Sequence, residues 1–126
     1  MNASGVLGTT ASSARFKRDV RDMAGASNTL LKLRPVVFRY RQEVVGAEES
    51  ELPQYGLIAE EVAEVAPELV APDAEGRPYS VRYHELAPML LNELQEQQRT
   101  IEELRGLARD LERRQVAVHD CDAQAR

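Results

Sequence analysis

The sequence has no tryptophan, a single cysteine and an aromatic content of only 5%. One cysteine cannot form an internal disulfide, so Cys121 excludes a disulfide-stapled scaffold and is consistent with a reducing compartment. Scarce aromatic side chains and 29% charged residues favour a thin core with a large solvated helical surface. We therefore do not expect a thick enzyme fold.

Further absences exclude several classes of partner. No apolar run is long enough to span a bilayer and no signal-peptide pattern opens the chain, so we expect no membrane partner. The net charge is −5, without a basic block interleaved with aromatics, which argues against nucleic acid. His84, His119 and Cys121 lack a closed ligand set, so we expect no zinc site and no other cofactor.

The first two thirds of the chain contain short elements without a repeating strand–helix–strand pattern. Alternating charged and apolar residues predict a short strand at 15–20, and a β-branched and aromatic run predicts one at 36–40. We expect a short strand or buried turn at 55–59 and strands at 69–71 and 79–83. The last two are expected to form a hairpin across the turn at 72–78. We also expect a short helix capped by Ser27 or Asn28 and ending before Pro35, a solvated arm at 42–54 and a helix at 60–66. The fold class is α+β.

The last third carries a heptad pattern, in which seam residues recur at alternating steps of three and four. These residues are Ala87, Leu90, Leu94, Gln97, Ile101, Leu104, Ala108, Leu111, Gln115 and Val118. Pro88 is expected in the first turn, which starts the helix near His84. One helix cannot bury such a stripe alone, and its width suits three-stranded packing or docking of the helix on the globular part. We favour a trimeric coiled coil, with Gln97 and Gln115 fixing the register. The alternative is an exposed, frayed distal half.

A serine and a lysine five residues apart, Ser12 and Lys17, are the candidate catalytic pair. A neutral lysine can take the proton of a serine nucleophile, and burial or neighbouring cations such as Arg15 and Arg18 favour that neutral form. Positions five apart face opposite sides of a strand and lie about 140° apart on a helix. The backbone must therefore bend at Ser13 and Ala14. By spacing alone, a loop serine and a solvated lysine are the simpler interpretation.

Five motifs in order resemble one family. Residues 12–20 resemble the serine-aspartate-x-arginine-leucine-lysine-lysine-aspartate-isoleucine start of the peptidase S74 domain, the intramolecular chaperone of phage tailspikes and endosialidases. Residues 33–38 resemble its leucine-arginine-proline-valine-x-phenylalanine element, and residues 56–62 its glycine-phenylalanine-isoleucine-alanine-glutamine-glutamate-valine signature. Residues 67–70, and then 79–83 with the leucine-rich helix, follow in order. The resemblance covers about residues 12–105.

The resemblance implies a C-terminal chaperone that trimerises, assists folding of an upstream β-structured fibre or spike, and then cuts itself off. The motif alignment makes Ser12 the nucleophile and Lys17 the base of a single-turnover serine endopeptidase. It implies assembly in the host cytoplasm and release from the mature phage fibre. Two positions depart from the family: Ser13 replaces an aspartate, and Phe16 replaces a leucine.

These inferences divide the chain into four parts. We expect a leader or stalk remnant at 1–11, an α+β head at 12–83, a coiled-coil helix at 84–118 and a disordered tail at 119–126. Because Met1 lies eleven residues before Ser12, we expect the sequence to be a piece of a longer polypeptide. Two other functions stay open, a trimerisation module of the same fold that does not cleave and a coiled-coil adaptor with an incidental head.

Overall fold

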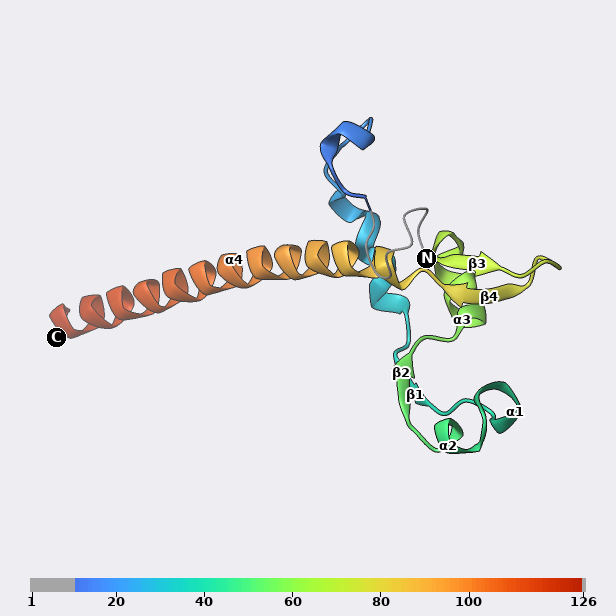
Figure 1. The fold of residues 1–126 in the computed structure, drawn as a ribbon. Helices are drawn as coiled ribbons and strands as arrows, with labels where there is room; N and C mark the ends of the chain where they lie inside the picture. The colour runs from blue at the N-terminus through green and yellow to red at the C-terminus, as the bar shows by residue number, and fades with distance from the viewer. Residues whose placement is uncertain (1–10, 126) are drawn as a thin grey trace.

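Two short antiparallel hairpins supply the strands of the head in the computed structural model, which describes residues 11–125. Strand β1 (Val36–Phe38) pairs with β2 (Gln54–Gly56), and strand β3 (Val70–Pro72) pairs with β4 (Pro78–Val81). Short helical segments and one long helix complete the described chain (Figure 1). The α+β prediction is thus confirmed.

The segment expected to be a solvated arm joins β1 to β2. It contains two helical turns, α1 (Gln42–Val45) and α2 (Ala47–Ser50), separated by Gly46 at φ +90°. That angle is in the region that L side chains rarely adopt, which explains the glycine between the two turns. The arm projects from the head beside the β1–β2 hairpin (Figure 1).

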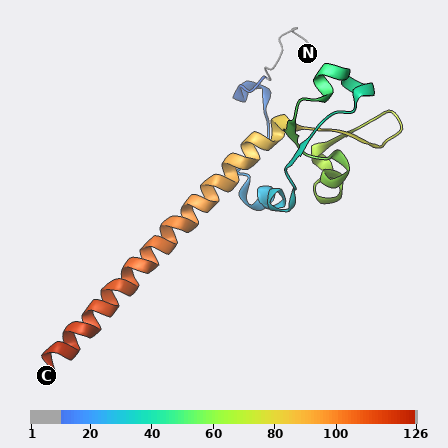
Figure 2. The same ribbon diagram turned by 90° about the horizontal axis from the view of Figure 1, so that it is seen from below.

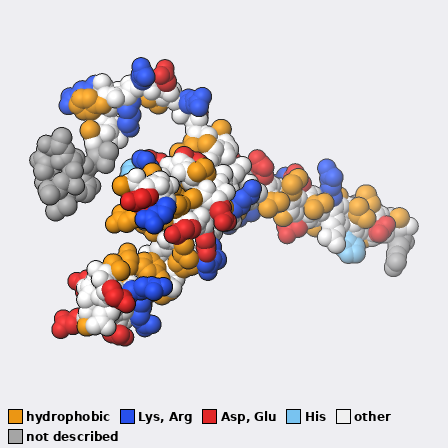
Figure 3. Space-filling view, turned by 90° about the vertical axis from the view of Figure 1, so that its right-hand side faces the viewer, with side chains coloured by type: hydrophobic (Ala, Val, Ile, Leu, Met, Phe, Trp, Pro, Cys, Tyr) orange, Lys and Arg blue, Asp and Glu red, His pale blue; other side chains and the backbone are white. Residues whose placement is uncertain are grey.

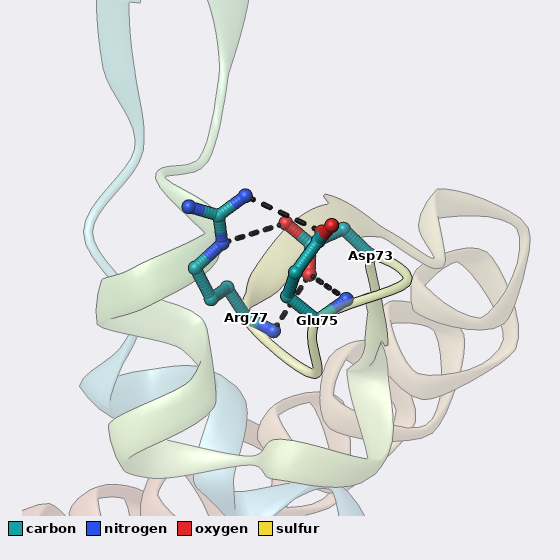
Figure 4. A network of polar contacts seen from close by, with 3 residues as sticks. All are labelled: Asp73, Glu75 and Arg77. Carbon is teal, nitrogen blue, oxygen red and sulfur yellow. Dashed lines mark hydrogen bonds and ion pairs between the residues drawn. The ribbon is translucent and has the colours of Figure 1, made fainter.

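The turn between β3 and β4 is organised by one aspartate (Figure 4). Asp73 Oδ1 accepts hydrogen bonds from the backbone N–H groups of Glu75 (3.0 Å) and Arg77 (2.9 Å), and Oδ2 accepts one from Arg77 Nε at 2.9 Å. These bonds hold the pKa of Asp73 below its usual value, with the Arg77 backbone bond as the largest cause. The turn at 72–78 forms as the sequence predicts.

A small core lies where helix α3 (Ala59–Val65) and the 3₁₀ turn η3 (Pro67–Leu69) meet the start of the long helix. Val62 and Leu69 are each only 1% exposed, and the fully buried apolar set is completed by Ala66, Val70 and Met89. Pro67 ends α3, because a proline interrupts the helix at the residue before it. The thin core that the composition predicts is therefore present.

Helix α4 (Tyr83–Gln124) is 42 residues long, which is about 63 Å at 1.5 Å per residue. Pro88 lies in its second turn, one turn later than expected. The helix also continues through residues 119–124, which corrects the expectation of a disordered tail at 119–126 for the described part. Neither proline nor glycine follows Gly106, so the sequence contains no signal that ends the helix earlier.

The segment before β1 differs from the sequence prediction. A 3₁₀ helix, η2, spans Ala24–Lys32, with Met23 rather than Ser27 or Asn28 at its N-cap position. Ser27 lies inside the element and is completely buried against α4, so its hydroxyl bonds a side chain of the long helix instead of capping. Pro35 still limits the element, which ends before Leu33 turns to an extended conformation.

Candidate functional site

Ser12 and Lys17 contact each other within one chain. Lys17 Nζ donates a hydrogen bond to Ser12 Oγ at 3.0 Å, a distance suited to proton transfer between a nucleophile and its base. The sequence requires a bend between the two residues, and the structure has one. The short 3₁₀ helix η1 (Ala14–Phe16) turns the chain, closed by bonds from Phe16 N–H to Ser13 C=O and from Lys17 N–H to Ala14 C=O, both at 3.0 Å.

The strand predicted at 15–20 is wrong. Its first residues belong to η1, and Asp19 has φ +55°, which a regular strand does not contain. An alternating pattern forms a strand only where a neighbour completes the hydrogen-bond ladder, and no strand pairs with this segment among the described residues. The segment instead forms a turn, which is the geometry that the Ser–Lys contact needs.

The dyad lies on an exposed N-terminal arm, which we define as residues 11–22. All twelve residues of this arm are exposed, and Figure 1 shows it in blue, standing away from the head. Phe16 and Val20 are 62% and 77% exposed, and the Arg15 guanidinium lies 4.7 Å from the Phe16 ring centre. Large apolar side chains in this position indicate a surface that another molecule can cover.

The arm joins the head at Ala24, whose φ of +49° is rare for a residue with a Cβ. Asn92 of α4 holds this point, because its Nδ2 donates to the Ala24 carbonyl at 2.7 Å. The same Nδ2 donates to Ser27 Oγ at 2.7 Å, and Ser27 Oγ donates to Glu93 Oε1 at 2.6 Å. We call Ser27, Asn92 and Glu93 the junction network.

Sequence reasoning missed the junction network. Glu93 follows Met89 by four residues, so both lie on the face of α4 that packs on η2, and Glu93 is only 8% exposed. An acidic residue on the core-facing stripe of a helix is the signal that could have revealed it, because buried carboxylates need partners.

The segments 33–38 and 56–62, which carry two of the motifs quoted above, make two specific contacts. Arg34 Nε donates to Glu61 Oε2 at 3.1 Å and its Nη2 donates to Oε1, so the two motifs are joined by a bidentate pair. This bond lowers the pKa of the Glu61 carboxyl. Gly56 lies against Tyr83, where an added Cβ would be 2.8 Å from the phenol oxygen, and that oxygen accepts a bond from Leu57 N–H at 3.0 Å.

The seam of α4 is exposed in the single chain. Leu94 and Ile101 are 63% and 42% exposed, and beyond Gln97 the helix runs past the head without a neighbour among the described residues (Figures 1 and 2). Hydrophobic side chains are visible along this projecting part (Figure 3). Of the described helices, none has the length and apolarity to cross a membrane.

His84 is the second residue of α4, as expected for a residue that opens the helix. Its Nε2 is 3.7 Å from Glu85 Oε1, and its side chain is mostly exposed. Among residues 11–125, no three His, Cys, Asp or Glu side chains come together in a way that could hold a metal ion. The pair Ser12 and Lys17, a hydroxyl and an amine in hydrogen-bond contact, is therefore our candidate site.

Comparison with known families gives a match to most of the head. Residues 12–71 match the family described as chaperone of endosialidase, peptidase S74. The chain contains a peptidase S74 domain. The match begins at Ser12 and includes Lys17, the Arg34–Glu61 pair and Gly56. No curated protein matches the chain. The match supports an intramolecular chaperone role for this domain.

Proposed function

We propose that the chain forms a homotrimer through the α4 seam and then cleaves itself at Ser12, with Ser12 as nucleophile and Lys17 as general base. The observation that carries this proposal is the 3.0 Å contact between Lys17 Nζ and Ser12 Oγ at the start of the S74 domain. Because both residues belong to one chain and a short turn joins them, the dyad needs no residue from another copy for its own geometry.

The proposed reaction starts with attack of Ser12 Oγ on the carbonyl carbon of Ala11, the nearest peptide bond. The Ser12 hydroxyl proton passes to Lys17 Nζ, and Lys17 returns it to the Ser12 nitrogen as the C–N bond breaks. Ala11 is then esterified on Ser12 Oγ. Water hydrolyses the ester, leaving a carboxylate on Ala11 and a free amine and hydroxyl on Ser12.

Trimer assembly supplies the environment that the single chain lacks. A lysine base must be neutral when it accepts the proton, and burial favours that form. Every residue of the N-terminal arm is exposed in one chain, so none of the described residues buries the dyad. Packing of a second copy on Phe16 and Val20 would exclude water from Lys17, so we expect cleavage to follow assembly.

The chaperone role follows from the same assembly. Three parallel helices would hold three upstream β-structured chains in register while those chains fold into a fibre or spike. Cleavage would then remove the folding module, so that the mature fibre is trapped kinetically. A reaction that each chain performs once needs no substrate pocket and no fast turnover. We place this event in the host cytoplasm during phage assembly.

Intact mass and sedimentation of the folded protein test the proposal. The unaltered chain should sediment as a trimer and lose the mass of residues 1–11, while Ser12→Ala and Lys17→Ala should remain full length and trimeric. A folded trimer that stays full length for days would contradict self-cleavage.

One observation favours a second function, a trimerisation module that does not cleave. Ser13 stands where the family has an aspartate, so any contribution of that carboxylate is missing. The same experiment separates the two functions, because this alternative gives a trimer without a cut. The variant Ser13→Asp should then restore cleavage if the missing carboxylate is the cause.

A further inference from the structure

The junction network is placed where the N-terminal arm leaves the body of the molecule. Ala24 is the second residue after the arm, and its left-handed backbone sets the direction in which the preceding chain departs. Asn92 Nδ2 bonds the carbonyl of this same residue at 2.7 Å. Such a conformation persists only when surrounding contacts hold it, and Asn92 supplies a side-chain contact at this point, beside the backbone bond from Ala26 N–H to Met23 C=O at 3.1 Å.

The network is polar and directional; its inner part, at Ser27 and Glu93, is buried, and Asn92 is half-buried. Asn92 uses its two amide hydrogens on Ala24 O and Ser27 Oγ, and Ser27 uses its only hydroxyl hydrogen on Glu93 Oε1 at 2.6 Å. Ser27 is completely buried and Glu93 is 8% exposed. A polar network that is buried at its centre and whose donors all have partners favours one arrangement of the groups around it. It therefore fixes η2 and the base of the arm on α4.

The network lies on the same stretch of α4 as the seam that we propose to form the trimer. Asn92 and Glu93 are within one helical turn of the seam residues Leu90 and Leu94, and at 100° per residue Asn92 is on the side of the helix opposite this seam. When the seams of three helices meet, the orientation of each α4 is fixed relative to its neighbours. The network then transfers that orientation to the arm through Ala24. Figure 1 shows η2 beside the N-terminal part of α4, with the arm continuing from it.

We propose that Ser27, Asn92 and Glu93 are positioning residues that aim the Ser12–Lys17 arm relative to the trimer seam, and so couple assembly to cleavage. This inference rests on the proposed function. The three side chains act through Ala24 and do not touch the reacting atoms. Without the network, the dyad would keep its own contact but would no longer be held against the surface that covers it in the trimer.

The first test measures the position of the arm without using cleavage. Spin labels are placed at Arg18→Cys on the arm and Glu103→Cys on α4, in a chain that also carries Cys121→Ser and Ser12→Ala. Labelled chains are refolded with an excess of unlabelled chains, so that the measured distances lie within one chain. The parent should give a narrow distance distribution, and Asn92→Ala should broaden it. Gln95→Ala, an exposed position on the same helix, is the matched control and should leave it narrow.

The second test measures cleavage by intact mass in chains with native Ser12, with the trimer checked by sedimentation. Asn92→Ala should remain trimeric but cleave about tenfold to a hundredfold more slowly, because a small displacement of a reacting group has effects of this size. Glu93→Gln retains an oxygen that accepts from Ser27 and should cleave close to the parent rate. Glu93→Ala should resemble Asn92→Ala, and Gln95→Ala should resemble the parent.

The outcomes distinguish this inference from the proposed function. If the parent trimer does not cleave, the proposed function fails, and the distance measurement alone decides whether the network positions the arm. If the parent cleaves, and Asn92→Ala leaves either the distance distribution or the rate unchanged in a trimer, the positioning role is overturned. Should Asn92→Ala fail to fold, Ser27→Ala removes the donor to Glu93, and the same two readouts decide.

Discussion

The two ends of helix α4 have opposite surroundings. Near its start, Met89 and Glu93 are buried against η2 and the core, and Asn92 and Tyr83 bond backbone groups of the head. Beyond Gln97 the same helix is exposed, although its seam keeps the same apolar pattern. At its start, the helix packs on the head through Leu86, Met89 and Glu93, whereas the seam residues Leu90 and Leu94 are exposed there as well. The head-packing face is therefore confined to the start of α4, while the seam has no partner within the described chain at either end, which supports the proposed association through the seam.

Ile101→Asp should have the largest effect of the variants considered, because it should abolish association through the exposed seam. It places three carboxylates into the seam of the proposed trimer, where unpaired charges cannot be buried, so the protein should sediment as a monomer. The head should stay folded, because Ile101 does not contact the core. Gln95→Asp adds the same charge at an outward position and should remain trimeric. A monomeric parent protein would refute trimer formation itself.

Leu69→Ala should have the largest effect at the other end. Leu69 is 1% exposed, and truncation of such a side chain costs about 2–5 kcal/mol of unfolding free energy. Because its partners lie in the same chain, the loss in chemical denaturation should not depend on protein concentration. Leu111→Ala, at an exposed seam position, should instead lower stability only where trimers form, so its effect should vary with concentration. If the stability losses of both variants depended equally on protein concentration, the core and the seam would not differ in where their partners lie.

Gly56→Ala tests how the head holds the first residue of α4. The new Cβ would lie 2.8 Å from the Tyr83 hydroxyl and 3.2 Å from Phe38 Cε1, so the tyrosine must move, and overpacking of this kind costs about 1–3 kcal/mol. Tyr83→Phe removes the atom in closest contact. In a double-mutant cycle by denaturation, the pair should therefore lose less than the sum of the single variants. If the losses of unfolding free energy in Gly56→Ala and Tyr83→Phe simply added, the contact between residue 56 and the Tyr83 hydroxyl would contribute nothing to stability.

Local patterns were sufficient to predict much of this molecule. The hairpin around Asp73, the helix beginning at Ala59, the bend between Ser12 and Lys17 and the long helix all follow from turn residues, periodicity and spacing. The role of Ser27 was not predictable, because a serine near a helix start is a normal cap, and its actual partners, Asn92 and Glu93, lie more than 60 residues away. The strand expected at 15–20 failed for the same reason, since a ladder depends on a distant neighbour.

The smallest expected effect concerns acid stability of the β3–β4 turn. The backbone and side-chain bonds from Arg77 and Glu75 hold the pKa of Asp73 below its value in the unfolded chain. Its stabilisation is therefore complete above the unfolded pKa of about 3.9 and is lost as the pH falls from there through the folded pKa. Asp73→Asn cannot titrate, so its unfolding free energy should fall less steeply in this acidic range than that of the parent. Denaturant melts at a series of pH values measure both slopes. Since the turn lies in the head, monomeric Ile101→Asp should show the same difference, whereas parallel slopes would mean that the Asp73 bonds do not favour the folded state.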